Sequence, residues 1–219
     1  MKSKLQTGAK ERGLVFVISA PSGTGKTTLV RRVMEQLPDL HFSVSYTTRY
    51  PRSNEQEGED YYFVSSSVFQ KMVERGEFLE WAKVLGNCYG TTLASVNQLA
   101  SKGMDLILDI DTQGAKKVME KMDQTILIYI LPPSLEALRE RLVERGLDSP
   151  EMIQLRLASA RKDMEEAHWY HYLIVNEKID DAIEKLKAII IAERCRKVKD
   201  SVLGEKMREW GEHYGKNYC

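Results

Sequence analysis

The stretch SAPSGTGKTTLVRRV, residues 19–33, decides how this chain folds. It follows the apolar run GLVFVIS (13–19), which is rich in β-branched and aromatic residues and predicts a buried strand. After it, four apolar residues recur at the spacing of a helix: Leu29, Val30, Val33 and Leu37. The loop between the two elements, residues 20–27, has the spacing of a phosphate-binding loop, with alanine at position 20 where glycine is usual.

The residue types of this loop suit the binding of a nucleoside triphosphate. Gly23 and Gly25 let the backbone curl so that successive N–H groups point inward, and the following helix adds its positive N-terminal end. Lys26 is expected to reach the β- and γ-phosphates, and the Thr27 hydroxyl to bind Mg²⁺. Ala20 is harmless only if its φ is negative, since a left-handed conformation at that position would require glycine. The alternative, an ordinary turn between strand and helix, does not account for this combination of residues.

Composition excludes several classes of protein. In 219 residues, Lys plus Arg and Asp plus Glu number 32 each, so no net charge draws the chain to nucleic acid or to a membrane. Apolar runs stay far below the roughly 20 residues that span a bilayer, and residues 1–13 lack the apolar centre of a secretory signal. The three cysteines are widely spaced, which predicts reduced thiols in a cytoplasmic protein: Cys88, Cys195 and Cys219.

The alternation of predicted strands and helices favours the α/β class, with a parallel, doubly wound sheet flanked by helices. Residues 42–92 depart from this pattern, because strands cluster there with little helix between them. We interpret them as a small mixed insertion at the carboxyl edge of the sheet, where ligands bind in such folds. Within it, 42–46 is expected to be one strand, and the polar loop 47–60 is not expected to pack internally.

The sequence pattern also predicts the structure of the C-terminal part of the chain, from residue 135 onward. The arginine-rich helical pair at 135–167 predicts a lid over the site. A long closing helix is expected over residues 179–198, and the last residues, GEHYGKNYC (211–219), carry no period and are expected to be loosely ordered.

The insertion offers candidates for a second substrate. Arg49 and Arg52 stand three apart in TTRYPR, close enough to converge on one phosphate, although two solvated loop cations would read the same way. Tyr61 and Tyr89 lie near strand ends, where their hydroxyls could reach that phosphate, although each would equally suit a small aromatic core.

A carboxylate in FLEWAKV suggests which base is bound. Glu80 lies between Leu79 and Trp81, so strand alternation turns it to the opposite face from both, either outward into solvent or inward into a cavity. An inward carboxylate suits guanine, whose N1–H and N2–H donors lie side by side, and does not suit adenine. The hydroxyls of Ser45 or Thr91 could serve the remaining edge atoms of the base.

Two further carboxylates, Asp109 and Asp111 in LILDIDTQG, lie at the carboxyl end of a buried strand and on the same face of it. An acidic strand end of this kind assists Mg²⁺ in phosphate-loop enzymes. Capping of the next helix would explain Asp111 but not Asp109.

Taken together, these segments resemble guanylate kinase over residues 13–196. The resemblance divides that range into a core (13–41, 93–134 and 168–196), a GMP-binding insertion (42–92) and a lid (135–167), and leaves 197–219 as a tail. The motifs that carry it occur in the expected order: SAPSGTGKTTL, FSVSYTTRYPR, GEDYYFV, FLEWA, GNCYGT, LILDIDTQGA, ILPPS, RLVERG and YLIVN.

The resemblance implies Mg²⁺-dependent phosphoryl transfer from ATP to GMP, and to dGMP, in purine nucleotide metabolism. It implies contacts with guanine from Ser45, Glu80, Thr91 and Asp111, and contacts with the GMP phosphate from Arg49, Arg52, Tyr61 and Tyr89. It places ATP on Ala20, Pro21, Ser22, Gly23, Thr24, Gly25, Lys26, Thr27 and Thr28, with Arg141 and Asn176 near the adenine. The resemblance also implies which residues stabilise the charge that develops during transfer: Lys26, Arg49, Arg145 and Arg156. It implies that Thr27 and Asp109 bind the metal. Cys88 stands where a second tyrosine is common, which leaves a thiol beside the pocket.

Two other functions are weighed against this one. A kinase for another nucleoside monophosphate would share the phosphate loop but not the guanine-specific carboxylate. A guanylate-kinase-like scaffold domain that binds phosphopeptides would typically lack the intact loop. The expected partners are therefore small nucleotides, with neither nucleic acid nor membrane, and a homo-oligomer is compatible with the sequence.

Overall fold

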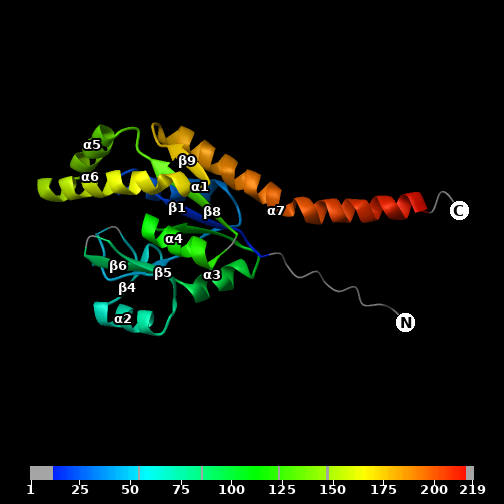
Figure 1. Cartoon of the computed structure of the whole chain (residues 1–219), viewed down its shortest axis with the longest axis horizontal. Helices are drawn as coiled ribbons and strands as arrows, with labels where there is room; N and C mark the ends of the chain where they lie inside the picture. The colour runs from blue at the N-terminus through cyan, green and yellow to red at the C-terminus, as the bar shows by residue number, and fades with distance from the viewer. Residues whose placement is uncertain (1–11, 54, 85, 123, 147, 216–219) are drawn as a thin grey trace.

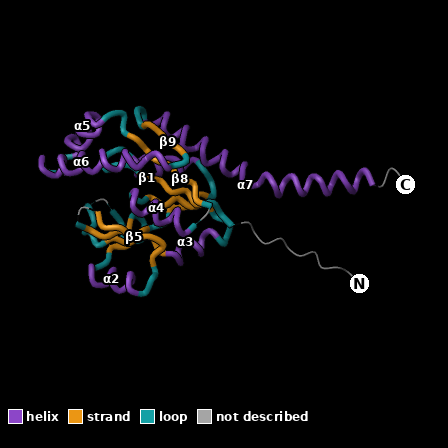
Figure 2. Tube along the Cα trace, in the orientation of Figure 1, coloured by secondary structure: helices purple, strands orange, loops and turns teal. Residues whose placement is uncertain are grey.

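A computed structural model describes residues 12–53, 55–84, 86–122, 124–146 and 148–215. Its centre is a five-stranded, fully parallel sheet (Figures 1 and 2). In spatial order the strands are β2 (Leu40–Phe42), β7 (Asp105–Asp109), β1 (Val15–Ser19), β8 (Thr125–Leu131) and β9 (Tyr172–Val175). The strand that precedes the phosphate loop is therefore the middle one, which fixes the loop at the centre of the sheet's carboxyl edge.

Helices cover both faces of this sheet, as the sequence predicted. Alternation along β1 sends Phe16 and Ile18 to one face and Val15 and Val17 to the other, and all four side chains are buried. The first face packs against α1 (Lys26–Gln36) and α7 (Ile179–Gly215), and the second against α3 (Leu93–Ala100), α4 (Thr112–Lys121) and η1 (Glu166–Trp169). Burial on both faces explains why these strands are continuous apolar runs.

The insertion forms a second, mixed sheet in the order β4-β3-β6-β5, flanked by α2 (Ser66–Glu74). Its strands are β3 (Ser45–Thr47), β4 (Tyr61–Phe63), β5 (Phe78–Val84) and β6 (Asn87–Thr92). β3 pairs with β4 in parallel, and the other pairs are antiparallel.

The expectation of a single strand over 42–46 is wrong. β2 ends at Phe42 in the central sheet, and β3 begins at Ser45 in the second sheet. The Ser43 N–H still donates to the carbonyl of Ile107 at 3.0 Å, so the chain leaves the central sheet within two residues. Strand-forming residues continue through 42–46, so the sequence pattern alone does not show that the chain changes from one sheet to the other there.

The expectation that the polar loop after β3 would not pack internally is also wrong. Glu55 and Asp60 keep only 11% and 12% of their side chains exposed. Asp60 accepts the backbone N–H of Gln56 at 2.8 Å and pairs with Arg31 of α1. Carboxylates order this loop because they accept backbone N–H groups that no strand or helix satisfies.

The lid consists of α5 (Leu135–Arg145) and α6 (Pro150–Glu165), which pack on each other through Leu138, Leu142, Ile153 and Ala160. α7 continues to Gly215, so the expected end of the closing helix at residue 198 is wrong, and the helix projects from the body of the molecule (Figure 1). Loose order is therefore a wrong expectation for residues 211–215, while 216–219 and Cys219 lie outside the described residues. In the described part of the chain, no helix is both long enough and apolar enough to cross a bilayer.

Candidate active site

The phosphate loop joins the end of β1 to the start of α1. Gly23 and Gly25 have φ of +94° and +92°, a region that side chains rarely tolerate. A Cβ on Gly23 would lie 2.8 Å from Leu142 Cδ2, so that lid side chain would also have to shift. Asp39 is the one described non-glycine residue with positive φ, so alanine at position 20 carries no such strain. Gly25 caps α1 without a side-chain hydrogen bond, which leaves the helix N–H groups to bind an anion.

Lys26 lies at the junction of the loop and the neighbouring strand. Its ammonium pairs with Asp109 at the end of β7 and donates to the Ile110 carbonyl at 3.3 Å. Both side chains are mostly buried, at 18% and 11% exposed. The parallel pairing of β1 with β7 thus brings together two charged residues that are 83 positions apart in the sequence.

The donor set beside Lys26 suits Mg²⁺. Thr27 lies exposed in the first turn of α1, and Asp109 supplies a carboxylate. Among the described residues, no three or more His, Cys, Asp and Glu side chains gather as a metal cage. Mg²⁺ ordinarily takes one or two protein ligands and fills the rest of its octahedron with water and phosphate oxygens, so a hydroxyl and a carboxylate fit it.

The two arginines of TTRYPR converge on Glu55, a residue that the sequence analysis missed. Arg49 pairs with the Glu55 carboxylate at 2.8 Å, and Arg52 approaches the same oxygen at 3.7 Å. Burial alone would raise the pKa of Glu55, but the hydrogen bonds from Arg49 and the Arg52 backbone lower it overall. The signal that could have revealed Glu55 is an acidic residue three positions after the second arginine.

Aromatic rings line the same cluster. The Arg49 guanidinium lies 5.5 Å from the centroid of the Tyr61 ring, and Tyr89 meets Tyr61 edge to face at 6.0 Å. The pKa of Tyr61 is raised, chiefly by burial and then by the nearby Asp109 carboxylate. Tyr61 therefore lies between the arginine cluster and the Lys26–Asp109 pair.

The lid adds two more arginines to this region. Arg156 donates to the Ser22 hydroxyl of the phosphate loop at 2.8 Å and pairs with Asp148 at 3.0 Å. The pKa of Arg145 is lowered, first by burial and then by the positive charges of Arg52 and Arg156. Cations from the insertion and the lid thus crowd one place, and an anion there would relieve their repulsion.

Arg141 and Asn176 brace the other side of the loop. Arg141 donates to the carbonyls of Thr24 and Asn176 at 3.2 and 3.0 Å, and the Asn176 amide donates to the Thr24 carbonyl at 2.7 Å. Asn176 is buried, and its Oδ1 has no hydrogen-bond partner among the described residues. Buried polar atoms normally have a hydrogen-bond partner, so this oxygen is a position where a bound ligand would supply the missing donor.

Glu80 points inward. It is 3% exposed, so the outward orientation weighed from the sequence is wrong. Its Oε1 accepts the Thr91 N–H at 2.9 Å, and the Thr91 hydroxyl contacts that of Ser45 at 3.0 Å. Asp111 caps α4 by accepting the Gly114 N–H at 2.7 Å. A Cβ on Gly114 would lie 2.6 Å from Glu80 Oε2, so glycine is what admits the carboxylate.

Burial raises the pKa of Glu80 to about 7, and the nearby Asp111 carboxylate adds to the shift, against the hydrogen bonds from Thr91 and the charge of Lys117. The folded pKa therefore exceeds the ordinary value of 4.5, so the folded state binds the proton more tightly than the unfolded chain. Glu80 then destabilises the fold progressively as pH rises from about 4.5 to about 7, and the cost is constant above that.

We predict that Glu80→Gln gains thermal stability relative to the parent across this pH window, because glutamine does not ionise. Unfolding curves recorded from pH 4.5 to pH 8 measure the difference in melting temperature between the two proteins. Glu120→Gln, at an exposed position, is the matched control and should show a constant difference. A difference for Glu80→Gln that does not grow with pH would contradict the assignment.

Cys88 does not face this site, so the interpretation of a thiol beside the pocket is wrong. Its side chain packs with Phe69, Met72 and Phe78 in the small core between α2 and the second sheet. Strand alternation along β6 sends Tyr89 to the opposite face.

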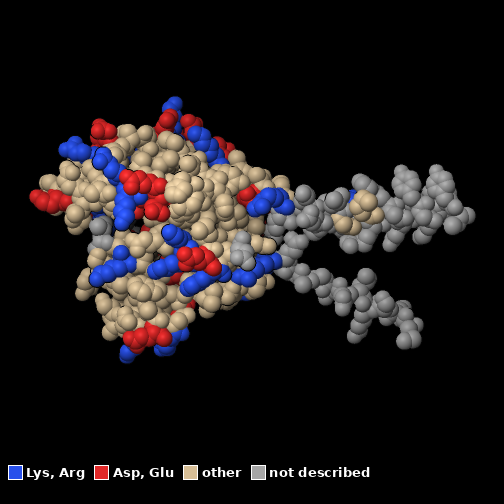
Figure 3. Space-filling view, viewed as in Figure 1, with Lys and Arg blue, Asp and Glu red and all other residues tan. Residues whose placement is uncertain are grey.

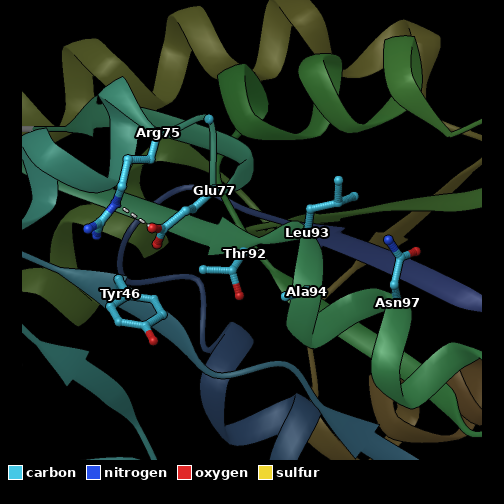
Figure 4. Close-up of a pocket in the computed structure, with 8 residues that line it drawn as sticks. Tyr46, Arg75, Glu77, Thr92, Leu93, Ala94 and Asn97 are labelled. Carbon is cyan, nitrogen blue, oxygen red and sulfur yellow. Dashed lines mark ion pairs between the residues drawn. The ribbon is translucent and has the colours of Figure 1, made fainter.

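An open groove of about 510 Å³ lies elsewhere on the insertion (Figure 4). It runs between the end of α2 and the start of α3, and its lining includes the Arg75–Glu77 ion pair and Tyr46. None of the sequence-predicted nucleotide contacts lines it.

A glycine-rich phosphate loop at the centre of a parallel sheet, with a mixed insertion and an arginine-bearing lid, defines a phosphate-loop nucleotide kinase. The sequence model of the guanylate kinase family matches residues 12–193, and the chain belongs to that family.

Comparison with individual proteins supports the same family assignment. The chain is 49% identical to a guanylate kinase of Geobacter metallireducens over 187 residues, covering 85% of this chain and 92% of the relative. It is 50% identical to that of Syntrophotalea carbinolica, covering 85% and 89%. The crystal structure of guanylate kinase from Anaplasma phagocytophilum superposes with a TM-score of 0.70 at 35% identity, covering 84% of this chain and 88% of that one.

Proposed function

We propose that this protein transfers the γ-phosphoryl group of ATP to GMP, giving ADP and GDP, and that dGMP is accepted as well. In a cell this reaction would supply the precursor of GTP. The observation that carries the choice of GMP is the buried Glu80 carboxylate beside Ser45, Thr91 and Asp111. Guanine is the base whose adjacent N1–H and N2–H donors match a carboxylate.

The chain's own residues supply positioning and charge. Phosphoryl transfer needs in-line substrates and neutralisation of the moving charge, and little covalent chemistry from the protein. ATP would lie on the loop N–H groups and Lys26, with its adenine near Arg141 and Asn176. The GMP phosphate would displace Glu55 as the partner of Arg49 and Arg52, and would also meet Tyr61 and Tyr89. Arg145 and Arg156 would then face the transferred group from the lid.

The metal proposed for this site is Mg²⁺, held by Thr27 and Asp109 together with phosphate oxygens. When bound, it neutralises charge on the β- and γ-phosphates. Lys26 would exchange its present partner Asp109 for those phosphates. No side-chain base is required, because the GMP phosphate is already anionic.

A substrate panel tests the proposal. GMP, AMP, dAMP, UMP and CMP are each supplied with ATP and Mg²⁺, and ADP formation is followed. GMP should exceed AMP in kcat/KM by at least about 100-fold, since a site built on hydrogen bonds rejects a base that leaves them unpaired. Preference for another monophosphate would instead identify a different nucleotide kinase, and binding without turnover would identify a scaffold domain.

Replacing either arginine of the cluster tests the phosphate site. Arg49→Ala and Arg52→Ala should each raise the Kd for GMP, because the charge-assisted contacts are lost, while the Kd for ATP stays near that of the parent. The change should be larger for Arg49, which is 16% exposed, than for Arg52, which is 41% exposed. Calorimetric titration of each nucleotide measures both constants, and an equal loss of ATP affinity would contradict the assignment.

A further inference from the structure

Helix α4 holds the outer strand of the second sheet by its backbone. β5 is an edge strand, paired to β6 on one side only. On its other side, the ammonium of Lys121 donates to the Leu79 carbonyl at 2.6 Å, and that of Lys117 donates to the Trp81 carbonyl. These two carbonyls belong to the residues on either side of Glu80.

The contact continues along one face of α4. Lys117 Nζ also lies 4.9 Å from the centroid of the Trp81 ring, and Gly114 abuts the Glu80 carboxylate. Positions 114, 117 and 121 are separated by three and four residues, which places them on the same side of a helix. In Figure 3, basic side chains gather over α4.

This arrangement links two carboxylates that come from different parts of the fold. Asp111 caps the start of α4, whereas Glu80 belongs to the inserted sheet. The side chain of Leu79 belongs to the same buried cluster as Ala115 and Val118 of α4, so an apolar contact already joins β5 to the helix. The hydrogen bonds from Lys117 and Lys121 to two alternate carbonyls of β5 add directional contacts, which specify where the backbone on either side of Glu80 lies along α4.

We propose that Lys117 and Lys121 are positioning residues for guanine recognition, acting on Glu80 through the β5 backbone. The proposal rests on the function proposed above and names residues that determine its base specificity. Partly exposed hydrogen bonds of this kind add little to net stability. Their effect should therefore appear in the position of the Glu80 carboxylate. A small displacement of a group that contacts the substrate lowers both the affinity for that substrate and the reaction rate.

The test is the double variant Lys117→Met/Lys121→Met, which keeps both aliphatic stems and the helix propensity but removes both ammonium groups. We expect the KM for GMP to rise about tenfold, with kcat and the KM for ATP within about threefold of the parent. Lys116→Met, at an exposed position on the same helix, is the matched control and should leave all three constants unchanged. Lys117→Arg/Lys121→Arg keeps both donors and should restore most of the affinity for GMP.

The outcomes separate this proposal from the function it rests on. A merely structural role would lower the active fraction, and so kcat, without moving the KM for GMP, and that result would overturn the proposal. If Glu80→Gln raises the KM for GMP but the lysine variants do not, the proposal fails and the function stands. If the parent does not phosphorylate GMP, the function itself fails. Should the double variant not fold, the two single variants give the same readout, each with a smaller expected rise.

Discussion

Lys26→Met is expected to lower kcat by on the order of 10³-fold or more, the loss that follows removal of a group that stabilises charge in the transition state. Lys26 is the first residue of α1, where the loop N–H groups would meet the phosphates, and its ammonium lies between the loop and Asp109 at the end of β7. Methionine has a similar length and helix propensity, so the backbone of the loop should not change.

The same variant leaves Asp109 without its cation. The carboxylate is 11% exposed, so an unfolding free energy lower by about 1–3 kcal/mol is expected, which a domain of this size tolerates. Steady-state kinetics at saturating ATP and GMP measure the catalytic loss, and urea unfolding measures the stability. A folded Lys26→Met protein with near-parental kcat would refute the kinase mechanism.

Glu80→Gln is expected to lower kcat/KM for GMP by roughly 10- to 1000-fold, from about 1–3 kcal/mol for an unpaired buried group and more where charge is involved. One oxygen of Glu80 already accepts the Thr91 N–H at 2.9 Å, which leaves the second for guanine. Glutamine has a single acceptor oxygen. If that oxygen keeps Thr91, the amide NH₂ meets the N1–H and N2–H donors of the base.

Measurement of kcat/KM for GMP and AMP in the parent and the variant checks this prediction. The ratio of the two should shrink in Glu80→Gln, because the loss is confined to guanine. Glu120→Gln, exposed on α4, should leave both values unchanged. A value for GMP within about threefold of the parent, a difference below 1 kcal/mol, would show that Glu80 does not contact the base.

The sequence predicted the core of the fold because its signals are local. Each signal is a pattern among residues close in sequence: the apolar run before Gly23, the helical spacing after Lys26 and the alternation of strands with helices. The structure confirms the parallel sheet that these patterns predict. Glu80 was singled out because strand alternation turns it to the opposite face from Leu79 and Trp81, and an inward carboxylate there would suit guanine. Its direction could not be predicted, because a shift in the β5–β6 register between Phe78 and Glu80 breaks the simple alternation, and Leu79 and Glu80 both lie against α4.

By itself, the sequence determined the phosphate loop, whose glycine conformations and helix N-terminus depend only on adjacent residues. Tertiary structure alone decided which charges meet. Lys26 beside Asp109, the cations of the lid beside those of the insertion, and the α4 lysines on the β5 carbonyls all join groups that no periodicity connects. A charged side chain in a polar segment carries no pattern that names its partner, because the partner is fixed only when the sheets and helices pack.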